Sequence, residues 1–193
     1  MLLSMELLDL SLVEPNGIRP ISRAEYERMV EVGILDEDDK IELLRGVIVA
    51  VSPQGWLHME VLVWLNATLV RALDEAYSVR PQGPYYADDW SMPEPDVCVV
   101  RKDPSRREHP SAALLVIEVA VSSLRMDRTA KQVIYAENGV PEYWVIDAER
   151  REVHVYTNPG QGGYTHHVML GDGEVLRPVL LPDVAISIAE MPR

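Results

Sequence analysis

Residues 114–121 read Leu-Leu-Val-Ile-Glu-Val-Ala-Val, an apolar run that is interrupted by a single acid, Glu118. A run of this kind is typical of a central β-strand that is covered on both faces. An ionised carboxylate in such surroundings costs several kcal/mol unless it has a partner. Glu118 therefore needs a bound cation, a network of hydrogen bonds or a raised pKa. The alternative is a structural role, as a buried acid that is paired with an arginine.

The segments around this run predict the other elements of the domain. Residues 95–100 (Pro-Asp-Val-Cys-Val-Val) repeat the pattern of a buried strand, and residues 56–76 carry the strongest helix pattern. One face of that helix is expected to hold Leu62, Leu65, Leu69 and Leu73, widened by Val61, Trp64 and Val70. In chain order we expect a capped helix from Ser22 to Gly33, a hairpin over 41–52, the helix over 56–76, strands over 77–87, 95–101 and 113–121, a helix over 126–138, strands within 142–157, and short strands beyond.

This order predicts one α/β domain over residues 1–193 with a mixed central sheet and additional β-strands at the N- and C-terminal edges. We divide it into an N-terminal arm (1–20), a helix plus β-hairpin (21–55), a core (56–157) and a C-terminal β extension (158–193). The long helix is so apolar that both the sheet and a second subunit are expected to cover it. A homodimer or higher homo-oligomer is therefore expected.

Composition limits the class of protein. The chain has 193 residues, and its 31 acidic against 18 basic side chains give a net charge of −13. This balance argues against tight, non-specific binding of nucleic acid, although a bound metal ion can reverse the local field. The denser basic spots, residues 101–107 and the pair Arg150-Arg151, are interpreted as solvated loops. Cys98 is the one cysteine, and the apolar N-terminus is too short to span a bilayer, so we expect a cytoplasmic protein without a membrane segment.

Asp96 and Glu118 together predict a metal site. If their strands are neighbours in the sheet, the start of one strand lies beside the end of the next, and both carboxylates can share one hard divalent cation. The backbone carbonyl of Val119 is a further candidate ligand. The alternative for Asp96 is a simple turn before its strand, because it follows Pro95.

Lys131 is the third candidate, because it stands in the helix that follows the second acid. The chain uses three lysines against fifteen arginines. A buried ammonium can orient an attacking water or stabilise developing negative charge. Gln132 and Tyr135 are expected on the same side of the helix. The alternative is an exposed helix lysine that pairs with Asp127, four residues before it.

Several other polar residues are possible accessories, and their roles stay open at this stage. His58 either touches a phosphate or caps its helix, and Glu42 is either a third acid or a salt-bridge residue of the hairpin. Ser122 and Ser123 are expected to cap the next helix. The side chains of His154, His166 and His167 lack the spacing of metal ligands.

The order of these motifs resembles the Uma-type restriction endonuclease family, a branch of the PD-(D/E)XK nuclease superfamily. The resemblance rests on Glu42-Leu-Leu-Arg-Gly46, His58, Pro95-Asp96, Glu118-Val119-x-x-Ser122, Asp127-x-x-x-Lys131-x-x-x-Tyr135 and Gly139-Val-Pro-Glu-Tyr-Trp-Val-Ile-Asp147. It implies a restriction-endonuclease-like αβββαβ core and hydrolysis of DNA with Mg²⁺ or Mn²⁺. Asp96 and Glu118 would then be the two superfamily acids. The superfamily lysine is expected two residues after the second acid, where this chain has Ala120, and the resemblance implies that Lys131 takes its place.

Two hypotheses for function follow from the sequence. The first is a metal-dependent endonuclease with Asp96, Glu118 and Lys131 as catalytic residues. The second is a catalytically silent interaction protein that keeps the nuclease fold and dimerises through its long helix and N-terminal arm, which the acidic composition favours. A glycosidase with two carboxylates is disfavoured, because the aromatic platforms that bind sugars are missing from the motifs.

Overall fold

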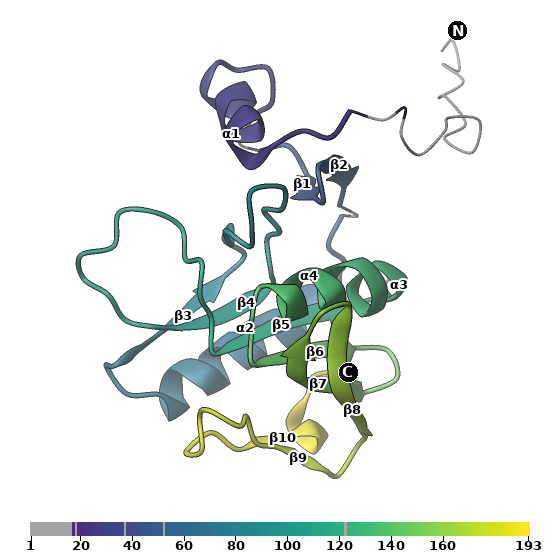
Figure 1. Cartoon of the computed structure of the whole chain (residues 1–193). Helices are drawn as coiled ribbons and strands as arrows, with labels where there is room; N and C mark the ends of the chain where they lie inside the picture. The colour runs from purple at the N-terminus through teal and green to yellow at the C-terminus, as the bar shows by residue number, and fades with distance from the viewer. Residues whose placement is uncertain (1–16, 18, 37, 52, 122) are drawn as a thin grey trace, which may run out of the picture.

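The structure is a computed structural model that describes residue 17 and residues 19–36, 38–51, 53–121 and 123–193. Most of the expected N-terminal arm, and Ser122, lie outside the described residues. The remaining chain forms a mixed α/β structure around one six-stranded sheet (Figure 1). The α/β class with a mixed sheet and additional edge strands is therefore confirmed.

The central sheet has the strand order β3-β4-β5-β6-β7-β8. Its strands are β3 (Tyr77–Pro81), β4 (Val97–Arg101), β5 (Leu115–Ala120), β6 (Glu142–Asp147), β7 (Glu152–Gly160) and β8 (Gly163–Leu170). Strands β5 and β6 are parallel and every other neighbouring pair is antiparallel. A parallel pair needs a crossover, and the helical segment between β5 and β6 supplies it. Together with α2 before β3, these elements form the expected αβββαβ order.

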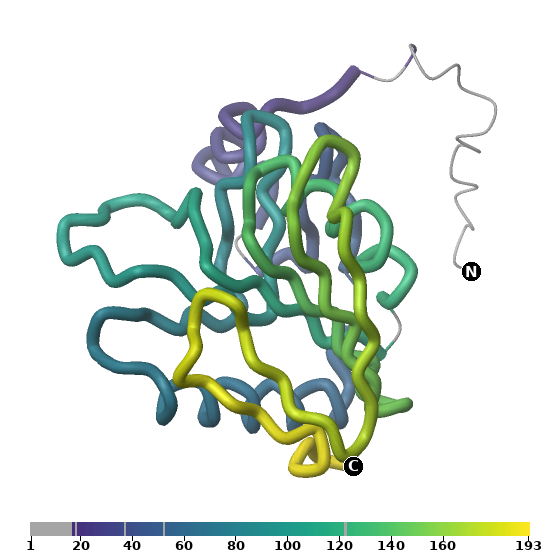
Figure 2. The backbone as a smooth tube through the Cα atoms, turned by 60° about the horizontal axis from the view of Figure 1, so that its bottom comes forward, coloured from purple at the N-terminus to yellow at the C-terminus, as the bar shows by residue number. Residues whose placement is uncertain are grey.

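Helix α2 (Trp56–Ala72) covers one face of the sheet and ends four residues before the predicted end. Its side chains Val61, Leu65 and Leu69 pack against Val99 and the neighbouring strand residues in the larger core. The C-terminal segment joins the same layer, and Figure 2 shows it running beside α2. The opposite side of α2 faces solvent. Val70, which the sequence placed on the buried face, is 55% exposed, so that prediction was wrong.

The other face of the sheet is covered by a helical segment of three parts, α3 (Leu124–Met126), a π-helical turn η3 (Asp127–Lys131) and α4 (Gln132–Glu137). It starts two residues earlier than predicted. Tyr135 of α4 packs on Tyr143 and other residues of this face in the second core. A π-helical turn is uncommon and occurs most often at functional sites.

Helix α1 (Arg23–Glu31) and the hairpin of β1 (Ile41–Leu44) and β2 (Val47–Ala50) lie together beyond one end of the sheet (Figure 1). The predicted capping box is confirmed, because the Ser22 hydroxyl accepts from the Glu25 amide while the Glu25 carboxylate accepts from the Ser22 amide. The hairpin turns at Gly46, which has a φ of +79°. A backbone hydrogen bond from the Met92 amide to the Leu43 carbonyl ties the hairpin to the segment that precedes β4.

The C-terminal part adds the two-residue strands β9 (Val175–Leu176) and β10 (Ile186–Ser187) and a short 3₁₀ turn η4 (Ile188–Glu190). Arg151, interpreted from the sequence as part of a solvated loop, instead donates to the carbonyls of Ile188 and Ala189, so its guanidinium ties the turn after β6 to the C-terminal segment. None of the helices in the described ranges has the length and apolar character that a membrane span requires.

Candidate functional site

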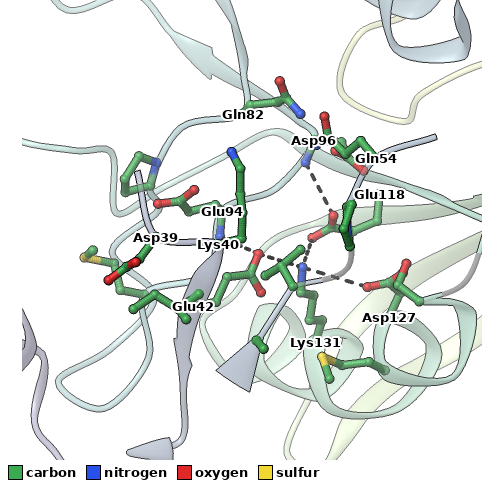
Figure 3. Close-up of a pocket in the computed structure, with 18 of the residues that line it drawn as sticks. Asp39, Lys40, Glu42, Gln54, Gln82, Glu94, Asp96, Glu118, Asp127 and Lys131 are labelled. Atoms are coloured by element: carbon green, nitrogen blue, oxygen red, sulfur yellow. Dashed lines mark hydrogen bonds and ion pairs between the residues drawn. The ribbon is translucent and has the colours of Figure 1, made fainter. Parts of the chain in front are cut away.

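A cavity of about 1100 Å³ lies where the β1–β2 hairpin faces the ends of β4 and β5 and the helical segment after β5. Six of the side chains that line it are acidic or basic and buried: Glu42, His58, Asp96, Glu118, Asp127 and Lys131. All six are more than nine-tenths buried. Figure 3 shows four of them, Glu42, Glu118, Asp127 and Lys131, converging from the hairpin, the sheet and the helix.

The register between β4 and β5 brings the two strand acids together. Val97 pairs with Ile117, which places Asp96, just before β4, beside Glu118 on the antiparallel neighbour. Asp96 Oδ2 accepts from the Val119 amide at 2.8 Å, and Glu118 Oε2 accepts from the Asp96 amide at 3.4 Å. Each acid is thus fixed by the backbone of the other strand, and the alternative of Asp96 as a mere turn residue does not describe its contacts.

Lys131 points at these acids from the helical segment. Its ammonium donates to Glu118 Oε1 and Glu42 Oε1, at 3.0 Å each, and lies 3.8 Å from Asp127 Oδ1. Burial alone would lower the pKa of Lys131, but these carboxylates outweigh burial and raise it. The ammonium therefore stays charged and acts as a donor. The exposed helix lysine considered from the sequence is not what the structure contains.

The π-helical turn places Asp127 and Lys131 on one side, with Tyr135 one turn further along. Tyr135 donates its hydroxyl to Glu118 Oε1 at 3.0 Å. Ser123 stands at the N-cap position but makes no side-chain cap; its hydroxyl donates to Asp127 Oδ2 at 2.5 Å. Burial raises the pKa of Asp127 to about 6. The expected capping role of Ser123 was therefore wrong, because its hydroxyl donates its hydrogen bond to the nearby Asp127 carboxylate.

Glu118 is buried among the other acids of the cavity. Burial raises its pKa well above the usual value, the Lys131 ammonium opposes that rise, and the neighbouring acids Asp127, Asp96 and Glu42 add to it. This is the perturbation expected for a carboxyl group held in a low-dielectric site with surplus negative charge. Strongly shifted groups of this kind gather at functional sites.

His58 of α2 contacts Asp96, the first of the two strand acids. Its Nε2 lies 3.1 Å from Asp96 Oδ2, the oxygen that also accepts from the Val119 amide. Within the described residues, the buried Nδ1 of His58 has no hydrogen-bond partner. His58 therefore holds a catalytic candidate in place, and its second nitrogen is unused.

Sequence reasoning missed Glu94, which lines the same cavity. Its amide donates to Glu42 Oε1 at 3.1 Å. Its pKa is raised, first by burial and then by the charge of Glu42. The signal that could have revealed it is its position between two prolines, two residues before Asp96. Glu42 is not a simple hairpin salt-bridge residue, since its other oxygen, Oε2, is buried and unpartnered in the described part of the chain.

Gln132 does not share the site, although it follows Lys131 directly. Its side chain accepts from the Tyr164 amide and contacts the turn at Gly163, on the β8 side of the helix. The π-helical turn ends at Lys131, and the next residue therefore faces away. His154 and His167 contact each other at 3.1 Å on β7 and β8, outside the cavity.

The donor set favours a hard cation. Among the described residues, no group of three or more His, Cys, Asp or Glu side chains already surrounds one point as metal ligands. Asp96 and Glu118 nevertheless supply two carboxylates, and the cavity holds more acids than Lys131 can balance. Mg²⁺ is commonly held by one or two carboxylates and several waters, so the residues present fit such an ion.

Comparisons with known proteins place the chain in a family and agree with its fold. A family model described as "Uma2: Putative restriction endonuclease" matches residues 23–189. A solved structure described as a putative nuclease belonging to DUF820 from Anabaena variabilis ATCC 29413 has a similar fold. It gives a TM-score of 0.70 with 18% sequence identity over 89% of this chain and 97% of that chain. No match was found among curated proteins.

Proposed function

Because the chain belongs to the Uma2 family, we propose that it is a metal-dependent phosphodiesterase that hydrolyses DNA, a restriction-type endonuclease. One observation carries the proposal: Asp96 and Glu118 from neighbouring strands and Lys131 from the following helix meet in one buried corner of a large cavity. We assign Asp96 and Glu118 as metal ligands and Lys131 as the catalytic ammonium.

Two carboxylate oxygens that have few or no hydrogen bonds support Mg²⁺ or Mn²⁺ as the ion. In the described ranges, Asp96 Oδ1 takes part in no hydrogen bond, and Glu118 Oε2 accepts one long bond of 3.4 Å. The Val119 amide points at Asp96, and the amide and carbonyl of one strand residue face the same side. The Val119 carbonyl is therefore a reasonable third ligand beside the two carboxylates.

When bound, such an ion supplies a Lewis acid that polarises the scissile phosphate and lowers the pKa of its water. Lys131 contributes a permanent positive charge to the same corner, because Glu118, Glu42 and Asp127 keep it protonated. It therefore neutralises charge that develops on the phosphate, or donates a hydrogen bond to the nucleophile, and does not accept a proton.

The remaining buried groups are positioning residues in this proposal. Glu42 and Asp127 hold the Lys131 ammonium. Tyr135 fixes one oxygen of Glu118, and His58 fixes one oxygen of Asp96. Because three carboxylates already fix the orientation of the Lys131 ammonium, it loses little conformational freedom when a substrate binds.

Calorimetric titration with Mg²⁺ or Mn²⁺ tests the metal site. Asp96→Asn and Glu118→Gln should each lower the affinity for the ion at least tenfold. Glu60→Gln, which removes an exposed acid of α2, should leave binding unchanged. Equal binding by all three variants and the wild type would remove the metal from the proposal.

Cleavage of supercoiled and single-stranded DNA tests the activity. Wild-type protein should cleave DNA in the presence of Mg²⁺. The cleavage rate of Lys131→Ala should be at least a hundredfold lower, as expected for loss of a group that stabilises transition-state charge. If wild type and Lys131→Ala show the same residual activity, Lys131 has no part in the mechanism.

A second candidate is a catalytically silent, homodimeric scaffold. The observation that favours it is the outer side of α2, where Trp56, Val63 and Val70 are exposed. Light scattering tests it: Val63→Glu should convert a dimer to a monomer if this side is the interface. The proposal also keeps the expectation of a cytoplasmic protein, which rests on the lone Cys98.

A further inference from the structure

A second hollow, of about 180 Å³, lies at the edge of the central sheet, over β3 and the segment that follows β4. Three cations line it, Arg80 of β3 and Lys102 and Arg106 of the segment after β4, together with two acids of that segment, Asp103 and Glu108. In the part of the chain that the structure describes, none of the three forms an ion pair with a carboxylate. Unpaired cations gathered in one place are unexpected in a chain with a net charge of −13.

Arg80 is on the same face of the sheet as the catalytic acids. Arg80 pairs with Cys98, and Cys98 pairs with Val116 on β5. Side chains two residues apart in a strand share a face, so Arg80, Cys98 and Glu118 point to the same side. The neighbours Val79 and Val99 pack into the core on the other side, under α2, which agrees with this assignment.

Arg80 acts on one of the residues that line the active-site cavity. Its charge lowers the pKa of His109, after the larger effect of burial, and His109 lines that cavity. This effect agrees with the placement of Arg80 on the same face of the sheet as Glu118.

Gln82 links Arg80 to the active-site cavity. It lies two residues after Arg80, lines the active-site cavity, and its amide donates to the Asp96 carbonyl. In Figure 3 it is beside Asp96, on the side away from Lys131. Strand spacing and residue rise place the Arg80 backbone about 12 Å from that of Glu118. One strand of a duplex rises ~3.4 Å per phosphate along the helix axis, and because the strand also winds around the axis its neighbouring phosphates are about twice that far apart in space, so this separation spans about two phosphates.

We propose that Arg80, Arg106 and Lys102 form a phosphate-binding subsite that holds the nucleic-acid backbone about two phosphates from the scissile position. This inference rests on the proposed nuclease function and adds the direction in which the strand leaves the active site. The basic segment 101–107 is then a substrate contact and not a solvated loop.

The test is binding of a fluorescein-labelled single-stranded DNA oligonucleotide, with all chains carrying Glu118→Gln to prevent cleavage. Adding Arg80→Ala and Arg106→Ala should lower the slope of log K against log salt by about 1.4, the value for two single-strand phosphates. Affinity at 0.1 M salt should fall roughly twentyfold. Arg71→Ala on α2, in the opposite layer, is the matched control. Arg80→Lys with Arg106→Lys should restore the slope.

A loss of less than twofold with an unchanged slope would overturn the subsite, as would an equal loss in Arg71→Ala or a failure of the parent chain to bind DNA. Cleavage separates this result from the proposed function. With Glu118 intact, the Arg80 and Arg106 substitutions should lower the ratio of oligonucleotide cleavage to bis-p-nitrophenyl phosphate hydrolysis at least fivefold. Wild-type protein that hydrolyses neither compound contradicts the nuclease, while the binding comparison still decides the subsite.

Discussion

Replacing Lys131 by methionine should destabilise the protein strongly, and by an amount that depends on pH. The substitution keeps most of the side-chain volume and removes the charge that faces Glu42, Glu118 and Asp127. Removing one partner of a buried ion pair typically costs about 3 to 5 kcal/mol, because the other charges stay buried without compensation. We expect a loss of that size in the free energy of unfolding at pH 8.

The pH dependence follows from the acids that are left. Glu118 and Asp127 already have raised pKa values, and loss of the ammonium raises them further. A group whose pKa is higher in the folded than in the unfolded protein stabilises the fold at low pH, and this contribution is lost as the pH rises through the folded pKa. The cost of Lys131→Met should therefore shrink as the pH is lowered from 8 to 5.

Urea unfolding at pH 5 and pH 8, without divalent ions, measures both quantities. Lys102→Met is the control, because Lys102 is exposed, and its effect should stay within about 0.5 kcal/mol. A loss below about 1 kcal/mol at pH 8 would refute the reasoning. So would a large loss of the same size at both pH values, since the acids would then not be responsible.

Two further predictions concern single residues. The pKa of Asp127 is about 6 in the folded protein, against an ordinary 3.8. Between pH 4 and 7 the wild type should therefore lose about 2 to 3 kcal/mol of stability relative to Asp127→Asn, as measured by urea unfolding. Stability curves that run parallel over this pH range would contradict the prediction. Gly46 has a φ of +79°, and an added Cβ would come within 2.5 Å of the Pro20 Cβ. Gly46→Ala should therefore lower the free energy of unfolding by about 1 to 3 kcal/mol, as measured by thermal unfolding. Gly33→Ala is the control, and it should cost less because the space around Gly33 is open.

The central sheet could be predicted because the sequences of two of its inner strands, β4 and β5, are apolar runs. The segments around Cys98 and Glu118 do not alternate apolar and polar side chains, and a strand of this kind must be covered on both faces. Once these two strands are taken as neighbours in the sheet, Asp96 and Glu118 must lie at adjacent strand ends. The observed pairing of Val97 with Ile117 is the register that this reasoning needs.

The helical part of the site could be predicted only in outline. The spacing of Asp127, Lys131 and Tyr135 suggests one side of a regular helix and would include Gln132. A π-helical turn between Asp127 and Lys131 changes which residues face the cavity, and no residue pattern used here encodes such a turn. Its cause lies in tertiary contacts, since Lys131 is drawn to acids on two other elements.

Contacts between distant segments were also invisible in the sequence. Glu42 reaches Lys131 across 89 positions, and Arg151 binds carbonyls 37 and 38 residues away. A basic residue in a polar turn gives the same local pattern whether it is solvated or bonded to a distant backbone. Propensity and periodicity describe neighbours along the chain, so pairings of this kind require the folded topology.

The uneven distribution of charge explains how so acidic a chain could act on a polyanion. Around the Asp96–Glu118 corner, acids outnumber the single ammonium of Lys131, so phosphate is repelled there until a divalent ion is present. Arg80, one of the unpaired cations of the second hollow, lies about 12 Å away on the same face. A strand held at Arg80 would therefore bring its scissile phosphate to the acids only when the ion has neutralised them. Binding and hydrolysis would then depend on different parts of one surface, and the net charge of the whole chain would decide neither.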